Sequence, residues 1–128
     1  MTAKSPEFDV GVLDLGEPTL LLLGDPVAFR WLSRELEALH SIVLGNPRGG
    51  GRRASLHILP AAVGSEFSCQ GNNFYWRLSS SEAEKVVQQL SALADSPRPA
   101  HAYLDPTVNS TGTQIVASVG EYDANRVF

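Results

Sequence analysis

Cysteine is almost absent from this sequence, which contains a single one, Cys69, in 128 residues. One cysteine cannot form an internal disulfide, whereas small secreted domains often depend on several. The longest apolar run, 20–23, is far too short to cross a bilayer, and the N-terminus lacks the apolar core of a signal peptide. These absences favour a reducing compartment, and we expect a cytoplasmic protein without a membrane partner.

Positive charge is also scarce. The chain has 10 lysines and arginines against 14 aspartates and glutamates, a formal net charge of −4. Nucleic-acid-binding domains normally carry a broad basic surface, so we expect no direct contact with DNA or RNA. The hydrophobic content of 43% is that of a globular protein, and the chain is too short for two independent cores. The sequence therefore predicts a single domain over 1–128.

The common signatures of enzymes and metal sites are missing as well. The three histidines, His40, His57 and His101, lack the close spacing of a zinc site, and no serine stands in a Gly-x-Ser-x-Gly turn. The glycines of 46–53 lack the Gly-Lys-Ser/Thr ending of a phosphate-binding loop. The sequence predicts no catalytic residue, no metal and no cofactor, and a protein that is not an enzyme.

What the chain does contain is a series of short apolar segments. Alternating residues and turn signals predict strands over 8–15, 19–23, 54–59, 67–70, 74–78, 100–105 and 113–119, with a hairpin turn at 71–73. Residues 1–7 and the basic, glycine-rich stretch 46–53 are expected to be flexible.

Two amphipathic helices are predicted between these strands. The first, over 26–40, has Asp25 at its N-cap position and Pro26 in its first turn. The second, over 80–94, follows serines whose spacing to Glu82 resembles a capping box. The side chains expected to face inward on the first helix are Phe29, Leu32, Leu36 and Leu39, and those expected to face water on the second are Glu82, Lys85, Gln88 and Gln89.

The order of these elements indicates the fold class. Strands and helices do not alternate regularly, which argues against a parallel, doubly wound sheet. An antiparallel sheet with both helices packed on one face fits the order better. The predicted fold is therefore α+β, with a mainly antiparallel sheet in a single domain.

Carboxylates and tyrosines gather near the ends of the last two predicted strands. Tyrosine contributes a large contact area at a low entropic cost, and carboxylates steer a basic partner. We therefore predict a partner-binding set, which consists of Tyr103, Asp105, Glu121, Tyr122 and Asp123.

Two other interpretations remain open. His101 and Asp105 should share one strand face, and Glu121 lies just beyond the neighbouring strand. If these three converge, they provide a general acid and base for a small-molecule-binding or enzymatic domain. Alternatively, the domain is a non-enzymatic subunit of a larger assembly that docks through an apolar patch near 20–23 or Trp31.

Three short segments carry a resemblance to a known family. They are Trp76-Arg77-Leu78-Ser79 leading into Glu82, then His101-Ala102-Tyr103-Leu104-Asp105, then Ser118-Val119-Gly120-Glu121-Tyr122-Asp123. Their order resembles that of small bacterial immunity proteins, which neutralise the toxins of polymorphic toxin systems. The resemblance covers about 74–123, and this chain has Asp123 where the family pattern often has a proline.

The resemblance implies a cytoplasmic, non-enzymatic inhibitor that binds a cognate toxin and occludes its active site. Many such toxins act on nucleic acids and carry basic clefts, for which an acidic partner is suited. Trp76 is expected to be a structural residue of the fold. The residues expected at the toxin contact are Asp105, Glu121, Tyr122 and Asp123.

Overall fold

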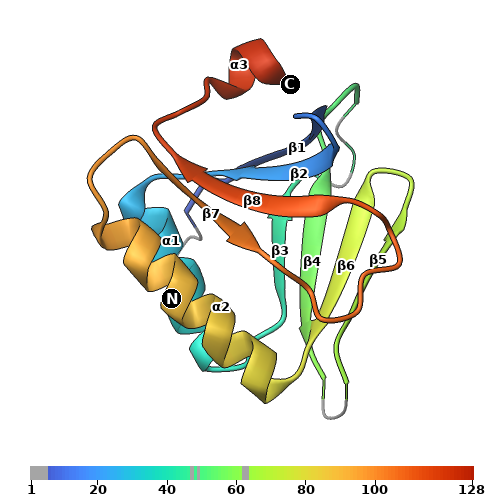
Figure 1. The fold of residues 1–128 in the computed structure, drawn as a ribbon, viewed down its shortest axis with the longest axis vertical. Helices are drawn as coiled ribbons and strands as arrows, with labels where there is room; N and C mark the ends of the chain where they lie inside the picture. Colours follow the sequence, from blue (N-terminus) through green and yellow to red (C-terminus); the bar gives the residue numbers. More distant parts are fainter. Residues whose placement is uncertain (1–5, 47, 49, 62–63) are drawn as a thin grey trace.

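The computed structural model describes residues 6–46, 48, 50–61 and 64–128. Within these residues, eight strands form two four-stranded sheets, and there are two long helices and one short one (Figure 1). The first sheet has the order β1 (Asp9–Asp14), β2 (Pro18–Leu23), β8 (Gln114–Val119), β7 (Ala100–Leu104). The second has the order β3 (Ile42–Gly45), β4 (Ser55–Pro60), β6 (Asn73–Leu78), β5 (Glu66–Gln70). The helices are α1 (Pro26–Glu37), α2 (Ser80–Asp95) and α3 (Ala124–Val127).

The expected α+β class in a single small domain is confirmed, and most strand pairs are antiparallel. Each sheet consists of two antiparallel pairs that meet through one parallel pair, β2 with β8 in the first sheet and β4 with β6 in the second. The strands thus form two sheets rather than the one expected. Hairpin signals in the sequence are local, and they do not show which hairpins become neighbours across the longer connections that parallel pairing requires.

Backbone hydrogen bonds join the two sheets at both edges. On one side, the N–H of Ala54 donates to the carbonyl of Val10 in β1 over 2.9 Å. On the other, the N–H of Phe67 in β5 donates to the carbonyl of Val108, in the loop between β7 and β8, over 2.8 Å. Because both edges are tied, the sheets enclose one shared core between their inner faces.

The helices α1 and α2 pack against each other on the same side of the molecule (Figure 1). Their apolar stripes enter the core, as the helical periodicity predicts. Burial of such side chains is the main source of stability in a domain of this size. The largest buried side chains of the core include Trp76, Phe29 and Phe67.

The first helix ends earlier than expected, at Glu37. Leu39 adopts the left-handed conformation with a φ of 58°, and its N–H donates to the carbonyl of Leu36 over 3.0 Å. The N–H of His40 donates to the carbonyl of Glu35 over 3.0 Å, which completes a Schellman motif. Leu39, expected in the buried stripe, is therefore 46% exposed.

Two short elements were not predicted, β3 and α3. The helix α3 and the adjoining Phe128 pack on the outer face of the first sheet, opposite the shared core (Figure 1). Outer-face side chains of β1, β2 and β8 form a second apolar cluster beneath them, which comprises Leu13, Leu21, Leu23 and Val116. Each of the two elements has four residues, too few to show a periodicity in the sequence.

The expected flexibility of 1–7 falls mainly on residues outside the described part of the chain, as do two positions, 47 and 49, of the stretch 46–53. The described end of that stretch makes specific contacts. Arg53 forms an ion pair with Asp9, and Asn72 donates to the carbonyls of Gly51 and Arg53. Among the described residues, no helix is long and apolar enough to cross a membrane.

Candidate functional site

The predicted partner-binding residues lie at both ends of the β7–β8 pair. The two strands are antiparallel, with His101 opposite Ser118. Residues 121–123 therefore follow β8 at the end where β7 begins, whereas Asp105 follows β7 at the opposite end. Four residues of extended chain separate His101 from Asp105, about 13 Å. The convergence on which the alternative enzymatic interpretation depends therefore does not occur, because the structure brings together only His101 and Glu121 of these three residues.

Glu121 is held by two neighbouring side chains. Its Oε1 lies 2.9 Å from Nδ1 of His101 and accepts a hydrogen bond from the hydroxyl of Ser118 over 2.8 Å. The carboxylate therefore stands between the serine and the histidine. In a catalytic triad the histidine stands between the serine and the carboxylate, because it must take the proton of the serine. The cluster lacks that order, and its contacts fix the carboxylate in place instead.

Two tyrosines of the predicted set are partly exposed, Tyr103 beside His101 and Tyr122 next to Glu121 in the chain. Tyr103 is 52% exposed, and its ring meets that of His101 edge-on with the centroids 5.5 Å apart. The backbone carbonyl of Tyr103, rather than its side chain, accepts a hydrogen bond from Gln89 in α2 over 2.8 Å. Tyr122 is 38% exposed and lies in the connection from β8 to α3. Both rings are placed to contact a partner.

Asp123 has a structural role in addition to its charge. It is the N-cap residue of α3, where its Oδ1 accepts a hydrogen bond from the N–H of Asn125 over 3.0 Å. Its other oxygen lies 3.8 Å from Nε of Arg126 in the same helix. A substitution of Asp123 therefore changes both the charge of the surface and the start of α3.

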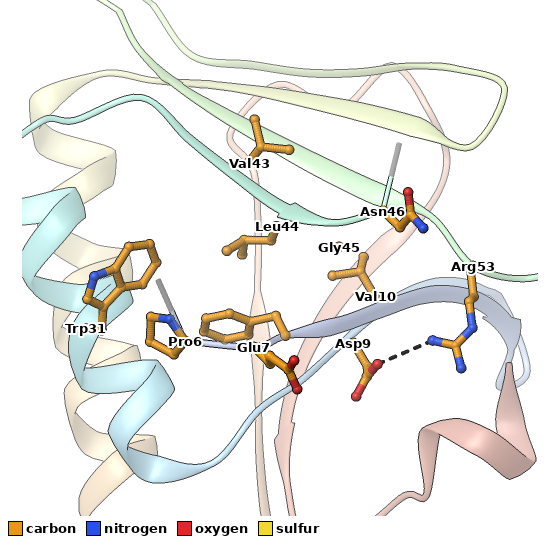
Figure 2. Close-up of a pocket in the computed structure, with 11 residues that line it drawn as sticks. Pro6, Glu7, Asp9, Val10, Trp31, Val43, Leu44, Gly45, Asn46 and Arg53 are labelled. Atoms are coloured by element: carbon orange, nitrogen blue, oxygen red, sulfur yellow. Dashed lines mark hydrogen bonds and ion pairs between the residues drawn. The ribbon is translucent and has the colours of Figure 1, made fainter. Parts of the chain in front are cut away.

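A groove of about 370 Å³ lies where β1 and β3 approach each other (Figure 2). Trp31 and Pro6 stand at one end of it, and the ion pair of Arg53 with Asp9, over 3.3 Å, stands at the other. Val43 adds an apolar side chain that is 54% exposed. Glu7 and Asn46 also line the groove, so its wall mixes apolar and polar groups.

A second cavity, of about 460 Å³, lies between α2 and the segment that follows β7. The predicted contact residue Asp105 lines it, together with Thr107. From the helix, Lys85 and Gln89 line it as well. The remaining polar side chains of the wall are those of Glu82 and Gln88.

Glu82 was expected to face water, and this expectation is wrong, because Glu82 is only 5% exposed. Its Oε1 accepts hydrogen bonds from the indole N–H of Trp76 over 3.0 Å and from the N–H of Thr107 over 3.2 Å. Its Oε2 is buried and has no hydrogen-bond partner among the described residues. A buried carboxyl oxygen in that state is unusual, since buried polar atoms are nearly always paired.

Only half of the predicted capping box forms, and this leaves the carboxylate of Glu82 free to turn inward. Ser79 is the N-cap of α2, and its hydroxyl accepts from the N–H of Glu82 over 3.4 Å, as the spacing predicts. The return bond of a capping box would run from the N–H of Ser79 to the glutamate. Here that N–H donates to the hydroxyl of Ser65 over 2.9 Å instead. The carboxylate of Glu82 is therefore available to Trp76.

Metal-binding side chains do not gather in the described part of the chain: no group of three histidines, cysteines or carboxylates is placed to hold an ion. His101 and Glu121 form a pair whose further neighbour is the hydroxyl of Ser118. The chain matches no family model, no curated protein and no solved structure.

Proposed function

We propose that this protein is a cytoplasmic immunity protein that binds and neutralises a cognate bacterial toxin without catalysing a reaction. The observation that carries the proposal is the surface at the end of β8. There His101 and Ser118 hold the carboxylate of Glu121 in place, Tyr103 contacts His101, and Tyr103 and Tyr122 are both exposed. Of the three sequence segments that resemble immunity proteins, two contribute to this surface, the one around His101 and the one around Glu121.

The chemistry of this surface suits a protein partner. Aromatic rings that are partly exposed lose their remaining hydration when a partner covers them, and tyrosines often dominate binding energies. Glu121 is already ordered, so less side-chain entropy is lost when it accepts a hydrogen bond from a lysine or arginine of the toxin. The net charge of −4 favours a basic partner, such as a toxin that acts on nucleic acids.

Occlusion of the active site is the simplest mode of inhibition for such a partner. A toxin that cleaves or modifies nucleic acid must expose a basic cleft for the phosphates. An acidic protein seated on that cleft competes directly with the substrate, and it needs no chemistry of its own. The inhibitor then acts in a one-to-one ratio with the toxin, and its effect depends on its affinity.

The test is co-expression with the product of the adjacent gene. We expect the neighbour to arrest growth alone, and this protein to restore growth and to co-purify with it. A neighbour that is harmless alone, or that is toxic but is neither bound nor neutralised, would overturn the proposal.

A tyrosine substitution tests the surface itself. Tyr103→Ala should weaken toxin binding by about 30-fold, the loss typical of a hot-spot residue. Tyr75→Ala is the matched control, because Tyr75 lies on the second sheet, where it stacks on His57 with the ring centroids 4.7 Å apart. Equal affinities of the two variants and the wild type would place the toxin contact elsewhere on the chain.

A further inference from the structure

The groove between β1 and β3 contains a free strand edge. β3 is the last strand of its sheet, so only one of its sides is paired, with β4. In an antiparallel pair, every second residue directs its N–H and C=O toward the neighbouring strand. Just after β3, the N–H of Asn46 donates to the carbonyl of Ala54 over 3.3 Å. The alternation therefore directs the backbone groups of Ile42 and Leu44 toward β4, and those of Val43 away from it.

This edge is closed at Gly45 and open at Val43. Gly45 lies against β1, because a Cβ atom added to it would approach that of Val10 to 2.8 Å. Val43, by contrast, is 54% exposed, and its outward N–H and carbonyl bond to no backbone group of another described residue. Both residues line the groove, and Trp31 stands at its far end (Figure 2).

An extended peptide segment fits such an edge. The free N–H and C=O groups of an edge strand pair readily with another strand, and many proteins recognise extended peptides in this way. The half-buried ring of Trp31 lines the same groove and offers a contact for one side chain of the segment. The volume of about 370 Å³ lies within the range of about 300–1,000 Å³ that is usual for ligand sites.

We propose that an extended segment of the protein partner adds to the edge of β3 as a fifth strand of the second sheet. Its backbone accepts a hydrogen bond from the N–H of Val43 and donates one to the carbonyl of Val43. One of its side chains packs against Trp31. The occupant named here rests on the proposed function, since the toxin is the partner that would supply the segment.

The position of the groove agrees with a contact that begins at the surface at the end of β8. A depression of about 410 Å³ adjoins the groove, and the two share Glu7 and Asp9 as lining residues. Gly120 and Tyr122, which follow β8, line this depression as well. A toxin seated at the end of β8 would therefore reach β3 through adjoining hollows.

The charge of the groove favours the toxin over a second copy of this chain. Asp9 and Arg53 form an ion pair, so the carboxylate of Glu7 sets the charge of the lining. A basic segment complements this charge, as does the basic toxin of the proposed function. Two copies of this chain would each carry a net charge of −4 and repel each other.

Hydrogen exchange, measured for single amides by NMR, tests the added strand. The N–H of Val43 should exchange at least about 10-fold more slowly in the toxin complex than in the free protein, because it gains an acceptor. Cys69, on the edge strand β5 of the same sheet, is the control. Its N–H also points away from the sheet, since that of Phe67, two residues earlier, donates outward to Val108. The Cys69 amide should exchange at the same rate in both states.

A proline substitution tests the same contact through affinity. Val43→Pro removes an N–H that bonds to no other strand of the sheet, and proline is tolerated on edge strands. The variant should keep the circular dichroism spectrum and the urea midpoint of the wild type, and should bind the toxin at least about 10-fold more weakly. Val43→Ala keeps the N–H and should stay within about 3-fold of the wild-type affinity.

An unchanged exchange rate of the Val43 amide in the complex would overturn this inference, as would wild-type affinity of a folded Val43→Pro variant. Either result leaves the immunity function intact. If Val43→Pro fails to fold, the exchange measurement on the wild type decides alone. A dimer of the free protein that the Val43→Pro substitution dissociates would overturn the choice of occupant, because a second copy would then hold the edge. A failure of the co-expression rescue overturns the function and, with it, the toxin as occupant.

Discussion

The indole N–H of Trp76 donates to Oε1 of Glu82 across 3.0 Å, and both side chains are buried. The bond connects the middle of β6 with the first turn of α2. The N–H of Thr107 donates to the same oxygen, so the segment after β7 is tied to this point as well. Glu82 thus joins three parts of the chain, and Trp76 lies in the core, in agreement with the structural role expected for it.

Trp76→Phe should lower the free energy of unfolding by roughly 2–4 kcal/mol, because it removes a buried donor to a carboxylate and leaves a gap in the core. Trp31→Phe is the control. Trp31 is half-buried at the edge of the core, so its change should cost less than about 1 kcal/mol. Urea denaturation followed by circular dichroism measures both. Equal losses would contradict the assigned role of the Trp76–Glu82 bond.

The burial of Glu82 shows what limits prediction from the sequence. Glu82, Val86 and Leu90 are spaced four residues apart, so helical geometry places all three on one face, and all three are buried. The position therefore indicated burial, but the charged residue type led to the opposite prediction. A partner was available in the sequence, since a buried tryptophan usually requires an acceptor for its N–H.

Local features of the fold were predictable, and long-range ones were not. The turn at 71–73 and the caps at Asp25 and Ser79 depend on a few adjacent residues, and the structure contains them. The pairing of β2 with β8 joins strands about 95 positions apart, as the register of Thr19 with Gln114 shows. No local pattern specifies such a partner. For the same reason, the opposite placement of Asp105 and Glu121 emerged only from the strand register.

The end of α1 provides a prediction of increased stability. Leu39 occupies the left-handed position of a Schellman motif, where glycine is usual, and its side chain is nearly half exposed. Leu39→Gly should raise the free energy of unfolding by about 0.5–1 kcal/mol. The substitution relieves backbone strain in the folded state, and the greater entropy that glycine gives the unfolded chain offsets part of this gain. Leu39→Ala keeps a Cβ atom and should give no gain. A gain of the same size for alanine would show that the exposed side chain, rather than the backbone, is responsible.

Phe128 packs on β1 at Gly11, so the effects of substitutions at these two positions on stability should be coupled. A Cβ atom added to Gly11 would overlap the ring of Phe128, which covers this part of the outer face. Gly11→Ala should therefore cost about 1–2 kcal/mol of stability in the wild-type background and less than about 0.5 kcal/mol in a Phe128→Ala background. Denaturation of the four proteins of this double-mutant cycle measures the coupling. Strictly additive effects would show that the ring does not occupy this place in solution.

The two roles of Asp123 can be separated because asparagine is nearly as good an N-cap residue as aspartate. Asp123→Asn should keep the bond to the N–H of Asn125 and leave the stability within about 0.5 kcal/mol, while it removes one negative charge from the surface. Asp123→Ala removes both the charge and the cap. If the carboxylate steers a basic toxin, the asparagine variant should associate about 2- to 3-fold more slowly, and the difference should shrink at high salt.

The binding kinetics of the two variants show whether toxin binding depends on the charge of Asp123 or on its role as the N-cap of α3. Slower association in both variants, with similar dissociation rates, assigns the effect to charge. Faster dissociation in the alanine variant alone assigns it to the position of α3, because loss of the cap loosens the start of the helix, which follows Tyr122 closely in the chain. Wild-type kinetics in both would remove Asp123 from the predicted contact. Stopped-flow measurements at two salt concentrations distinguish these outcomes, since only a charge effect is screened by salt.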